Sequence, residues 1–222
     1  MVWEQPLLDL NRIRSAAWRL SPFRWAKVDQ IFTSLETASS LRKAFPSDDY
    51  KAFVRLVGLK RHQLTGKLLS TQPRKKSALS PLWQQFCAEV YSPEYRSALQ
   101  ETSGILLDDL HAEITLWRHG SGCFIDPHTD NDAKKLVQLV YFSDEYWTAA
   151  QGGCLRLLRS NDIHDYEEEI LPVLGTSVLF ERSASSWHGY LPITGSRSLR
   201  LAAQIVFHEP SLKYSGNSER SS

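Results

Sequence analysis

The sequence has only three cysteines, and their placement argues against two common uses of this residue. Cys87, Cys123 and Cys154 are odd in number and widely spaced among 222 residues. Cysteines with this number and spacing are not typical of a disulfide-bonded protein. Because the sequence has no CxxC pair, a structural zinc site is not expected either. We therefore expect a reduced protein with a cytoplasmic location.

Long hydrophobic runs and a strong net charge are also missing. No apolar stretch approaches the roughly 18 residues of a membrane span, and residues 1–6 do not resemble the start of a secretory signal. The 26 basic and 25 acidic residues leave a net charge of +1. Because no long-range field results, we expect neither nucleic acid nor a membrane as a partner. The local basic stretches at 60–62 and 74–76 are interpreted as solvated loops.

The composition that remains, 42% hydrophobic and 11% aromatic, is typical of a folded globular domain. Three Ser-Pro pairs begin at Ser21, Ser80 and Ser92. Each pair favours a helix start, because serine caps helices and proline fits the first helical position. Apolar residues recur near helical spacing after the first two pairs, and Gly104 suits the end of the third helix. Region 1–105 is therefore predicted to be mainly helical.

From about residue 110 the pattern changes to short strands separated by glycine turns. Ile114 and Leu116 alternate with more polar residues, which is strand periodicity. Further strand-like runs follow at 136–142, 154–158, 172–180 and 199–207. Such a series predicts an antiparallel sandwich or barrel over residues 106–209. A polar tail at 210–222 is expected to be disordered.

An HxD pattern is the strongest candidate for chemistry. Residues i and i+2 of a strand project to the same side, so His128 and Asp130 could bind one metal ion together. His188, which lies in a Trp-His-Gly sequence, is the best candidate for a third ligand. Two histidines and one carboxylate on one face of a six-coordinate ion are typical of non-haem iron(II) oxygenases. The related HAE pattern at 111–113 lies in a regular alternating strand and is interpreted as a surface pair.

An arginine that follows His188 is the candidate for binding a co-substrate. Arg197 comes after a turn marked by Pro192 and Gly195. Its guanidinium is always charged and offers a planar fork of donors, which suits a carboxylate. Arg200 is the alternative, and it would lie on the opposite face of the same strand. The register that we favour selects Arg197.

Several separated motifs resemble the prolyl 4-hydroxylase-type 2-oxoglutarate dioxygenases. They lie at 122–131, 140–142, 152–157, 187–192 and 197–199. The resemblance covers about residues 110–208. It implies a double-stranded β-helix (jelly-roll) core, so the expected fold class is mainly β with N-terminal helices packed against that core. It also implies Fe(2+) at His128, Asp130 and His188, 2-oxoglutarate as co-substrate at Arg197, and L-ascorbate as a candidate reductant.

The activity implied by this resemblance is oxidation of an unactivated C–H bond with O2, with release of succinate and CO2. The expected substrate is an amino acid, a prolyl-type peptidyl residue or a small natural product. One alternative is a non-catalytic jelly-roll binding module. Another is the same enzyme class performing desaturation, epoxidation or cyclisation.

One departure from the family pattern concerns the co-substrate pocket. Many relatives place a tyrosine near the 2-oxoglutarate carboxylate, whereas the favoured register puts Phe142 there, with Gln138 on the same face as a substitute polar contact. Candidates for the substrate pocket are Trp117, Arg118, Asn131 and Trp147. For the two tryptophans, core packing is favoured over a role in the pocket. Three other histidines, His119, His164 and His208, are interpreted as surface or loop residues.

Overall fold

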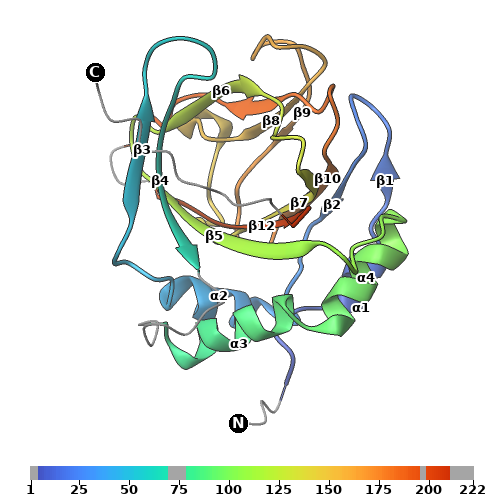
Figure 1. Ribbon diagram of the computed structural model, residues 1–222. Helices are drawn as coiled ribbons and strands as arrows, with labels where there is room; N and C mark the ends of the chain where they lie inside the picture. The colour runs from blue at the N-terminus through green and yellow to red at the C-terminus, as the bar shows by residue number, and fades with distance from the viewer. Residues whose placement is uncertain (1–4, 70–78, 196–198, 211–222) are drawn as a thin grey trace, which may run out of the picture.

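The centre of the molecule is one strongly curled antiparallel sheet (Figure 1). The computed structural model describes residues 5–69, 79–195 and 199–210. Within them the strand order is β1-β2-β10-β7-β12-β5-β4-β6-β11-β8-β9, and β3 pairs with β4 outside this path. The strands are β1 (Trp18–Arg19), β2 (Trp25–Val28), β3 (Lys51–Arg55), β4 (His62–Leu69), β5 (His111–His119), β6 (Phe124–His128), β7 (Lys134–Tyr141), β8 (Leu155–Leu158), β9 (Tyr166–Ile170), β10 (Ser177–Glu181), β11 (His188–Tyr190) and β12 (Arg200–His208).

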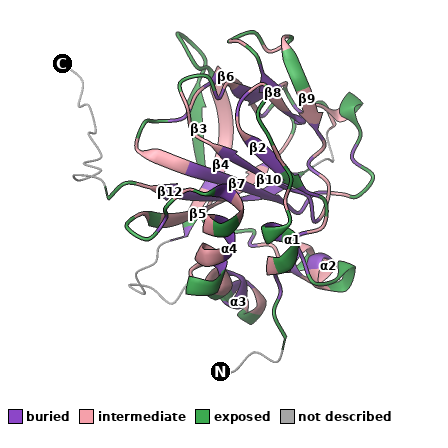
Figure 2. Cartoon of the chain, turned by 90° about the vertical axis from the view of Figure 1, so that its right-hand side faces the viewer, coloured by how far each residue is buried: buried purple, intermediate pink, exposed green. Residues whose placement is uncertain are grey.

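The helices gather on one outer face of this sheet. They are α1 (Leu10–Arg14), α2 (Leu35–Lys43), α3 (Pro81–Val90) and α4 (Pro93–Ser103), and a short 3-10 helix lies at Ala149–Gln151. Figure 2 shows buried residues where helices and sheet meet. At that boundary the rings of Trp83 and Phe86 in α3 lie 5.1 and 5.9 Å from the ring of Phe142. Burial of such large aromatic side chains fixes the helices on the sheet. This arrangement confirms the predicted fold class, mainly β with packed helices.

The two faces of β7 divide the hydrophobic core in two. Leu136, Val140 and Phe142 belong to the cluster that faces the helices. Val137, Leu139 and Tyr141 belong to a second cluster inside the curled sheet. Both faces are buried from Leu136 to Tyr141, and Gln138 is the one polar residue of that run. Its sequence therefore shows no alternation that would reveal which face points inward.

The prediction of a mainly helical region 1–105 is wrong in part. The second and third Ser-Pro pairs do begin helices, since the hydroxyls of Ser80 and Ser92 accept hydrogen bonds from backbone N–H groups of α3 and α4. Gly104 ends α4 with a φ of 68°. After Ser21-Pro22, however, the chain forms β2, which pairs with β10. Pairing with this distant strand satisfies the backbone hydrogen bonds of the segment. Tertiary contacts therefore override the helical spacing of its apolar residues.

The basic stretch at 60–62 agrees with its interpretation as a solvated loop at Lys60 and Arg61, which are exposed between β3 and β4, but not at His62. His62 begins β4, a strand that connects β5 to β6 within the sheet. The other basic stretch, 74–76, lies outside the described residues, and so does the predicted polar tail at 210–222 apart from its first residue. None of the helices that the structure describes is long and apolar enough to cross a membrane.

Candidate metal centre

Three residues from the HxD and His-Gly motifs meet inside one end of the sheet. His128 ends β6 and His188 begins β11, and the two are direct partners in the antiparallel ladder. Their rings therefore lie side by side, with centroids 4.3 Å apart. Asp130 follows β6 by two residues, and its Oδ2 lies 3.8 Å from His188 Nε2. One candidate ligand atom from each of the three residues lies within 4.8 Å of the others.

Backbone carbonyls orient both imidazoles toward a common point. His128 Nδ1 lies 2.9 Å from the carbonyl oxygen of Asp126, and His188 Nδ1 lies 2.9 Å from that of Ser186. A carbonyl only accepts, so each Nδ1 donates and each Nε2 keeps its lone pair. Burial is the main cause that lowers the pKa of both histidines. Both rings are therefore neutral at pH 7, the form that binds a metal.

Asp130 supplies the test of whether these residues fit a metal ion. Its Oδ1 accepts a hydrogen bond of 2.7 Å from Lys134 Nζ. Its Oδ2 is buried and has no hydrogen-bond partner within the described part of the chain. Burial alone would raise the pKa of Asp130, but His188 and Lys134 beside it hold that pKa well below its usual range. A buried, ionised oxygen without a partner next to two imidazole lone pairs fits a divalent cation.

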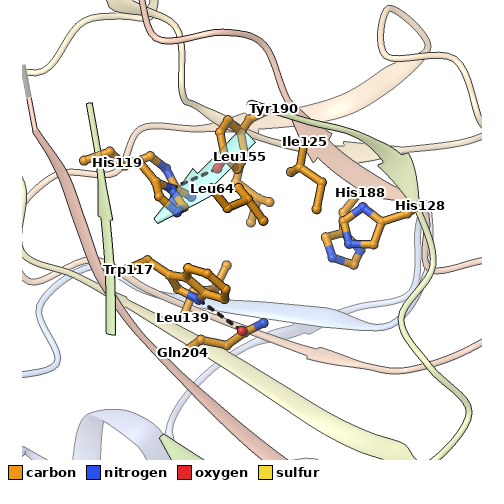
Figure 3. A pocket seen from close by; sticks show the side chains of 11 residues that line it. Leu64, Trp117, His119, Ile125, His128, Leu139, Leu155, His188, Tyr190 and Gln204 are labelled. Atoms are coloured by element: carbon orange, nitrogen blue, oxygen red, sulfur yellow. Dashed lines mark hydrogen bonds between the residues drawn. The ribbon is translucent and has the colours of Figure 1, made fainter. Parts of the chain in front are cut away.

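A pocket opens beside the two histidines and extends into the sheet (Figure 3). His128 and His188 lie at one side of it, and His119 and Tyr190 lie across it. Most of the remaining lining is apolar or aromatic, from Leu64, Trp117, Ile125, Leu139 and Leu155, with Arg200 and Gln204 as polar groups. An apolar pocket with a few polar groups is typical of a small-molecule site.

Arg200 is the cation of this pocket. It is only 2% exposed, and its guanidinium donates to the carbonyl oxygen of Gly153 at 2.8 Å and to the hydroxyl of Tyr141 at 3.2 Å. The guanidinium carbon lies 5.0 and 4.5 Å from the ring centroids of Tyr141 and Tyr190. Among the described residues no carboxylate pairs with Arg200. A buried positive charge without a counter-ion fits an anionic ligand.

The structure corrects the register that was expected for β7. Tyr141 points into the sheet and contacts Arg200, whereas Phe142 packs against the helices. Gln138 lies on the same helix-facing side as Phe142 and bonds Tyr95 and Ser177. It therefore does not line the pocket. The tyrosine expected near an anionic co-substrate is present, one residue before the position that the sequence analysis chose.

The candidate substrate residues have separate positions. Trp117 lines the pocket and donates from Nε1 to the side-chain oxygen of Gln204 at 3.1 Å. Arg118 follows it on the opposite face of β5. Burial raises the pKa of Tyr50, and the charge of Arg118 partly opposes this shift. Asn131 accepts a hydrogen bond from the backbone N–H of Ala133 in the turn after Asp130.

Trp147 packs in a small apolar cluster outside the pocket, with Cys123, Cys154 and Ile193. Its Nε1 donates to the carbonyl oxygen of Gly152 at 2.9 Å. For this tryptophan the structure therefore favours core packing.

One pocket residue was assigned to the surface in the sequence analysis. His119 is 2% exposed and lines the pocket, and its Nδ1 lies 2.9 Å from the hydroxyl of Tyr190. Its position two residues after Trp117 on β5 was the available signal, because residues i and i+2 share a face. Arg197, the favoured co-substrate residue, lies outside the described residues.

Comparisons with known proteins agree with this geometry. The family model for the 2OG-Fe(II) oxygenase superfamily matches residues 114–208, which contain all three candidate ligands. No curated protein sequence matches the chain. A prolyl-4-hydroxylase from Pseudomonas putida is similar in structure, with 20% identity, a TM-score of 0.60, and coverage of 86% of this chain and 95% of that chain.

Two further solved structures show the same fold. A prolyl hydroxylase from Trichoplax adhaerens, in complex with a hypoxia inducible factor peptide fragment, is 15% identical with a TM-score of 0.59 and covers 90% of this chain and 89% of that one. The non-haem α-ketoglutarate-dependent epimerase SnoN from nogalamycin biosynthesis is 11% identical with a TM-score of 0.56, covering 90% and 83%. The curled sheet is therefore a double-stranded β-helix. Residues 114–208, which form most of this core, are similar to the 2OG-Fe(II) oxygenase superfamily, the 2-oxoglutarate-dependent non-haem iron dioxygenases.

Proposed function

We propose that this protein hydroxylates an unactivated C–H bond of an amino acid, a prolyl-type peptidyl residue or a small natural product. The observation that carries the proposal is one pocket that contains two histidines of the candidate metal-binding triad and a buried arginine with no carboxylate partner among the described residues. His128, Asp130 and His188 would hold Fe(2+), and Arg200 would bind the distal carboxylate of 2-oxoglutarate. The prolyl hydroxylases among the similar structures support an amino-acid or peptidyl substrate.

Each polar group of the pocket has a role in this proposal. Arg200 offers a charged donor to the carboxylate, and its bond to Gly153 holds the guanidinium in place. The hydroxyl of Tyr141 accepts from Arg200 and is free to donate to the same carboxylate. A buried, charge-assisted arrangement of this kind gives both affinity and orientation. We therefore assign the anion-binding role to Arg200 in place of Arg197.

The apolar walls exclude water from the reacting groups. Leu139 and Leu155 are buried beside the triad, and their side chains offer no proton to transfer. When bound, iron(II) would supply activation of O2 coupled to oxidative decarboxylation of 2-oxoglutarate to succinate and CO2. The protein would supply the position of the ligands and protection from water. L-Ascorbate would serve as the reductant that keeps the iron ferrous.

Anaerobic addition of Fe(II) and 2-oxoglutarate tests this assignment. We expect a visible metal-to-ligand charge-transfer band in the wild-type protein and none in Asp130→Ala, because that variant loses one of three ligands. No band in the wild type would favour a non-catalytic jelly-roll module. With O2, candidate amino acids, peptides and metabolites should then be screened by mass spectrometry for one added oxygen coupled to succinate. Succinate formed with loss of two hydrogens would instead indicate desaturation or cyclisation, whereas epoxidation would add one oxygen across a C=C bond, which NMR spectroscopy of the product distinguishes from hydroxylation.

A further inference from the structure

The strand β3 leaves one long side of the sheet open. Its five residues pair with β4 from Lys51↔Gly66 to Arg55↔His62, and all five are exposed. Among the described residues no other strand pairs with its outer side. Figure 1 shows β3 beside β4 at the outside of the sheet. The backbone N–H and C=O groups that point away from β4 are therefore open to another strand.

The exposed side chains of β3 are apolar in the middle and basic at both ends. Phe53 is 45% exposed and Val54 is 56% exposed. Lys51, Phe53 and Arg55 share one face because alternate residues of a strand project to the same side. Neither Lys51 nor Arg55 forms an ion pair with a described carboxylate. This face therefore offers two free positive charges on either side of an aromatic ring.

The turn that follows β3 extends the same surface. Leu56, Val57 and Leu59 are 57, 78 and 90% exposed. Residues 51–69 contain five Lys or Arg and no Asp or Glu. Within the described parts of the chain, two of these five form ion pairs, Lys67 with Asp48 and Arg61 with Asp126. A partner for this edge must therefore supply apolar side chains and negative charge.

The charges on β3 also decide against a second copy of this chain as the occupant. If two β3 strands paired antiparallel about Phe53, Lys51 of each would lie opposite Arg55 of the other. Parallel pairing would likewise bring cations together. Like charges opposite one another in a sheet are destabilising, whereas opposite charges stabilise. An acidic strand replaces each repulsion with an attraction.

We propose that the outer edge of β3 binds an extended, acidic polypeptide segment, which adds to the sheet as a further strand. The backbone of the edge provides the hydrogen bonds, and Lys51 and Arg55 select for acidic residues. The ring of Phe53 lies 6.3 Å from that of Trp117, which lines the pocket. The added strand would therefore lie beside β3, whose Phe53 contacts a residue of the wall of the candidate metal pocket. This proposal does not depend on the substrate assigned above.

Synthetic peptides test the proposal by fluorescence anisotropy. The probe is a fluorescein-labelled nonapeptide of alternating valine and glutamate with blocked ends. We expect it to bind the wild-type protein, and we expect the same peptide with lysine in place of glutamate not to bind. N-methylation of successive central residues removes backbone donors on both edges of the peptide, so this form should also lose binding.

Charge reversal on the protein provides the complementary test. Lys51→Glu/Arg55→Glu turns two attractions into repulsions, so affinity for the acidic peptide should fall at least about fivefold. The matched control Lys27→Glu/Lys43→Glu makes the same change of net charge on β2 and α2 and should bind as the wild type does. Circular dichroism checks that each variant is folded.

Three results would overturn the proposal. One is equal binding of the acidic peptide to Lys51→Glu/Arg55→Glu and to the wild type. Another is undiminished binding of the N-methylated peptide, which would show that no strand is added. The third is absence of peptide binding together with a concentration-dependent dimer in sedimentation, which would assign the edge to a second copy of the chain.

Discussion

Arg200 is a buried cation that forms no ion pair with a carboxylate of the described residues. Replacing it with alanine removes one charge-assisted interaction with 2-oxoglutarate, which contributes about 1.5–3 kcal/mol. We therefore expect Arg200→Ala to weaken 2-oxoglutarate binding roughly tenfold to over a hundredfold, with Fe(II) affinity unchanged. Anaerobic titration of the charge-transfer band measures both affinities.

Arg197→Ala is the matched control for this prediction. It removes an arginine three residues earlier in the chain and should leave the affinity for 2-oxoglutarate within about twofold. If Arg197→Ala weakened binding while Arg200→Ala did not, the assignment of Arg200 would be wrong and the original choice from the sequence would stand.

The difference between these arginines shows which parts of the site a sequence can predict. His128 and Asp130 are two residues apart at the end of β6, so their meeting depends only on the local course of the chain. The position of Arg200 depends on pairing with β5, where it lies opposite His119. Nothing local marks where β12 begins. A shift of register by one residue moves side chains to the other face, which also explains the exchange of Tyr141 and Phe142.

His119 should make the stability of the metal-free protein depend on pH. Burial, followed by the nearby charge of Arg200, lowers the pKa of His119 well below 6.5. The unfolded chain therefore takes up a proton near pH 6.5 while the folded protein does not, so stability is complete above that pH and is lost as pH falls. His119 alone should cost about 1 kcal/mol between pH 6.5 and 5.5.

Urea unfolding at several pH values measures this contribution. We expect His119→Gln to reduce the loss of unfolding free energy over that interval by about 1 kcal/mol. His164→Gln, at an exposed position, is the control and should keep the wild-type slope. An unchanged slope in His119→Gln would contradict the neutral, buried state of His119.

At the scale of elements, local sequence signals predicted the ends of helices correctly. They failed where a segment pairs with a strand that is distant in the sequence. Ser80, Ser92 and Gly104 define α3 and α4 because caps act within a few residues. Ser21-Pro22 offers the same signal, yet β2 follows it and binds β10, more than 140 residues away in sequence. The helical expectation failed there because the apolar residues are used by the sheet.

The turn before β8 depends on Gly152. Its φ is 67° and its ψ is −165°, and an added Cβ would lie 2.0 Å from the carbonyl oxygen of Pro192. Only glycine adopts this conformation readily. The contacted oxygen belongs to the backbone of Pro192, so it cannot move away as the end of a flexible side chain could. We expect Gly152→Ala to lower the free energy of unfolding by about 2–4 kcal/mol. Urea denaturation measures this change.

Gly104 provides a control with a similar φ but open surroundings. Its φ is 68°, and no atom of the described residues would lie within 4 Å of an added Cβ. Gly104→Ala should therefore cost only about 1 kcal/mol, from backbone strain alone. Equal effects of the two substitutions would show that contact with Pro192 contributes nothing.

Because Gly153 accepts a hydrogen bond from Arg200, Gly152→Ala should also weaken 2-oxoglutarate binding.

At the scale of the whole molecule, a metal ion would connect segments that are distant in the chain. His128 lies on β6 and His188 on β11, and the loop with Asp130 leads into β7. The three ligands come together only in the folded protein, so an ion that binds them stabilises that state. Without an ion, Asp130 Oδ2 is a buried anionic oxygen that accepts no hydrogen bond from the described residues.

Metal addition should therefore raise the unfolding temperature. At a concentration 100 times its dissociation constant, an ion adds about 2.7 kcal/mol, which corresponds to roughly 5–10 °C for a chain of this length. Mn(II) avoids oxidation during a thermal scan, and differential scanning calorimetry measures the shift. Asp130→Ala should abolish it, whereas Asp132→Ala, whose exposed carboxylate pairs with Arg182, should retain it. A shift that persists in Asp130→Ala would mean that the ion binds elsewhere and that the triad does not hold it.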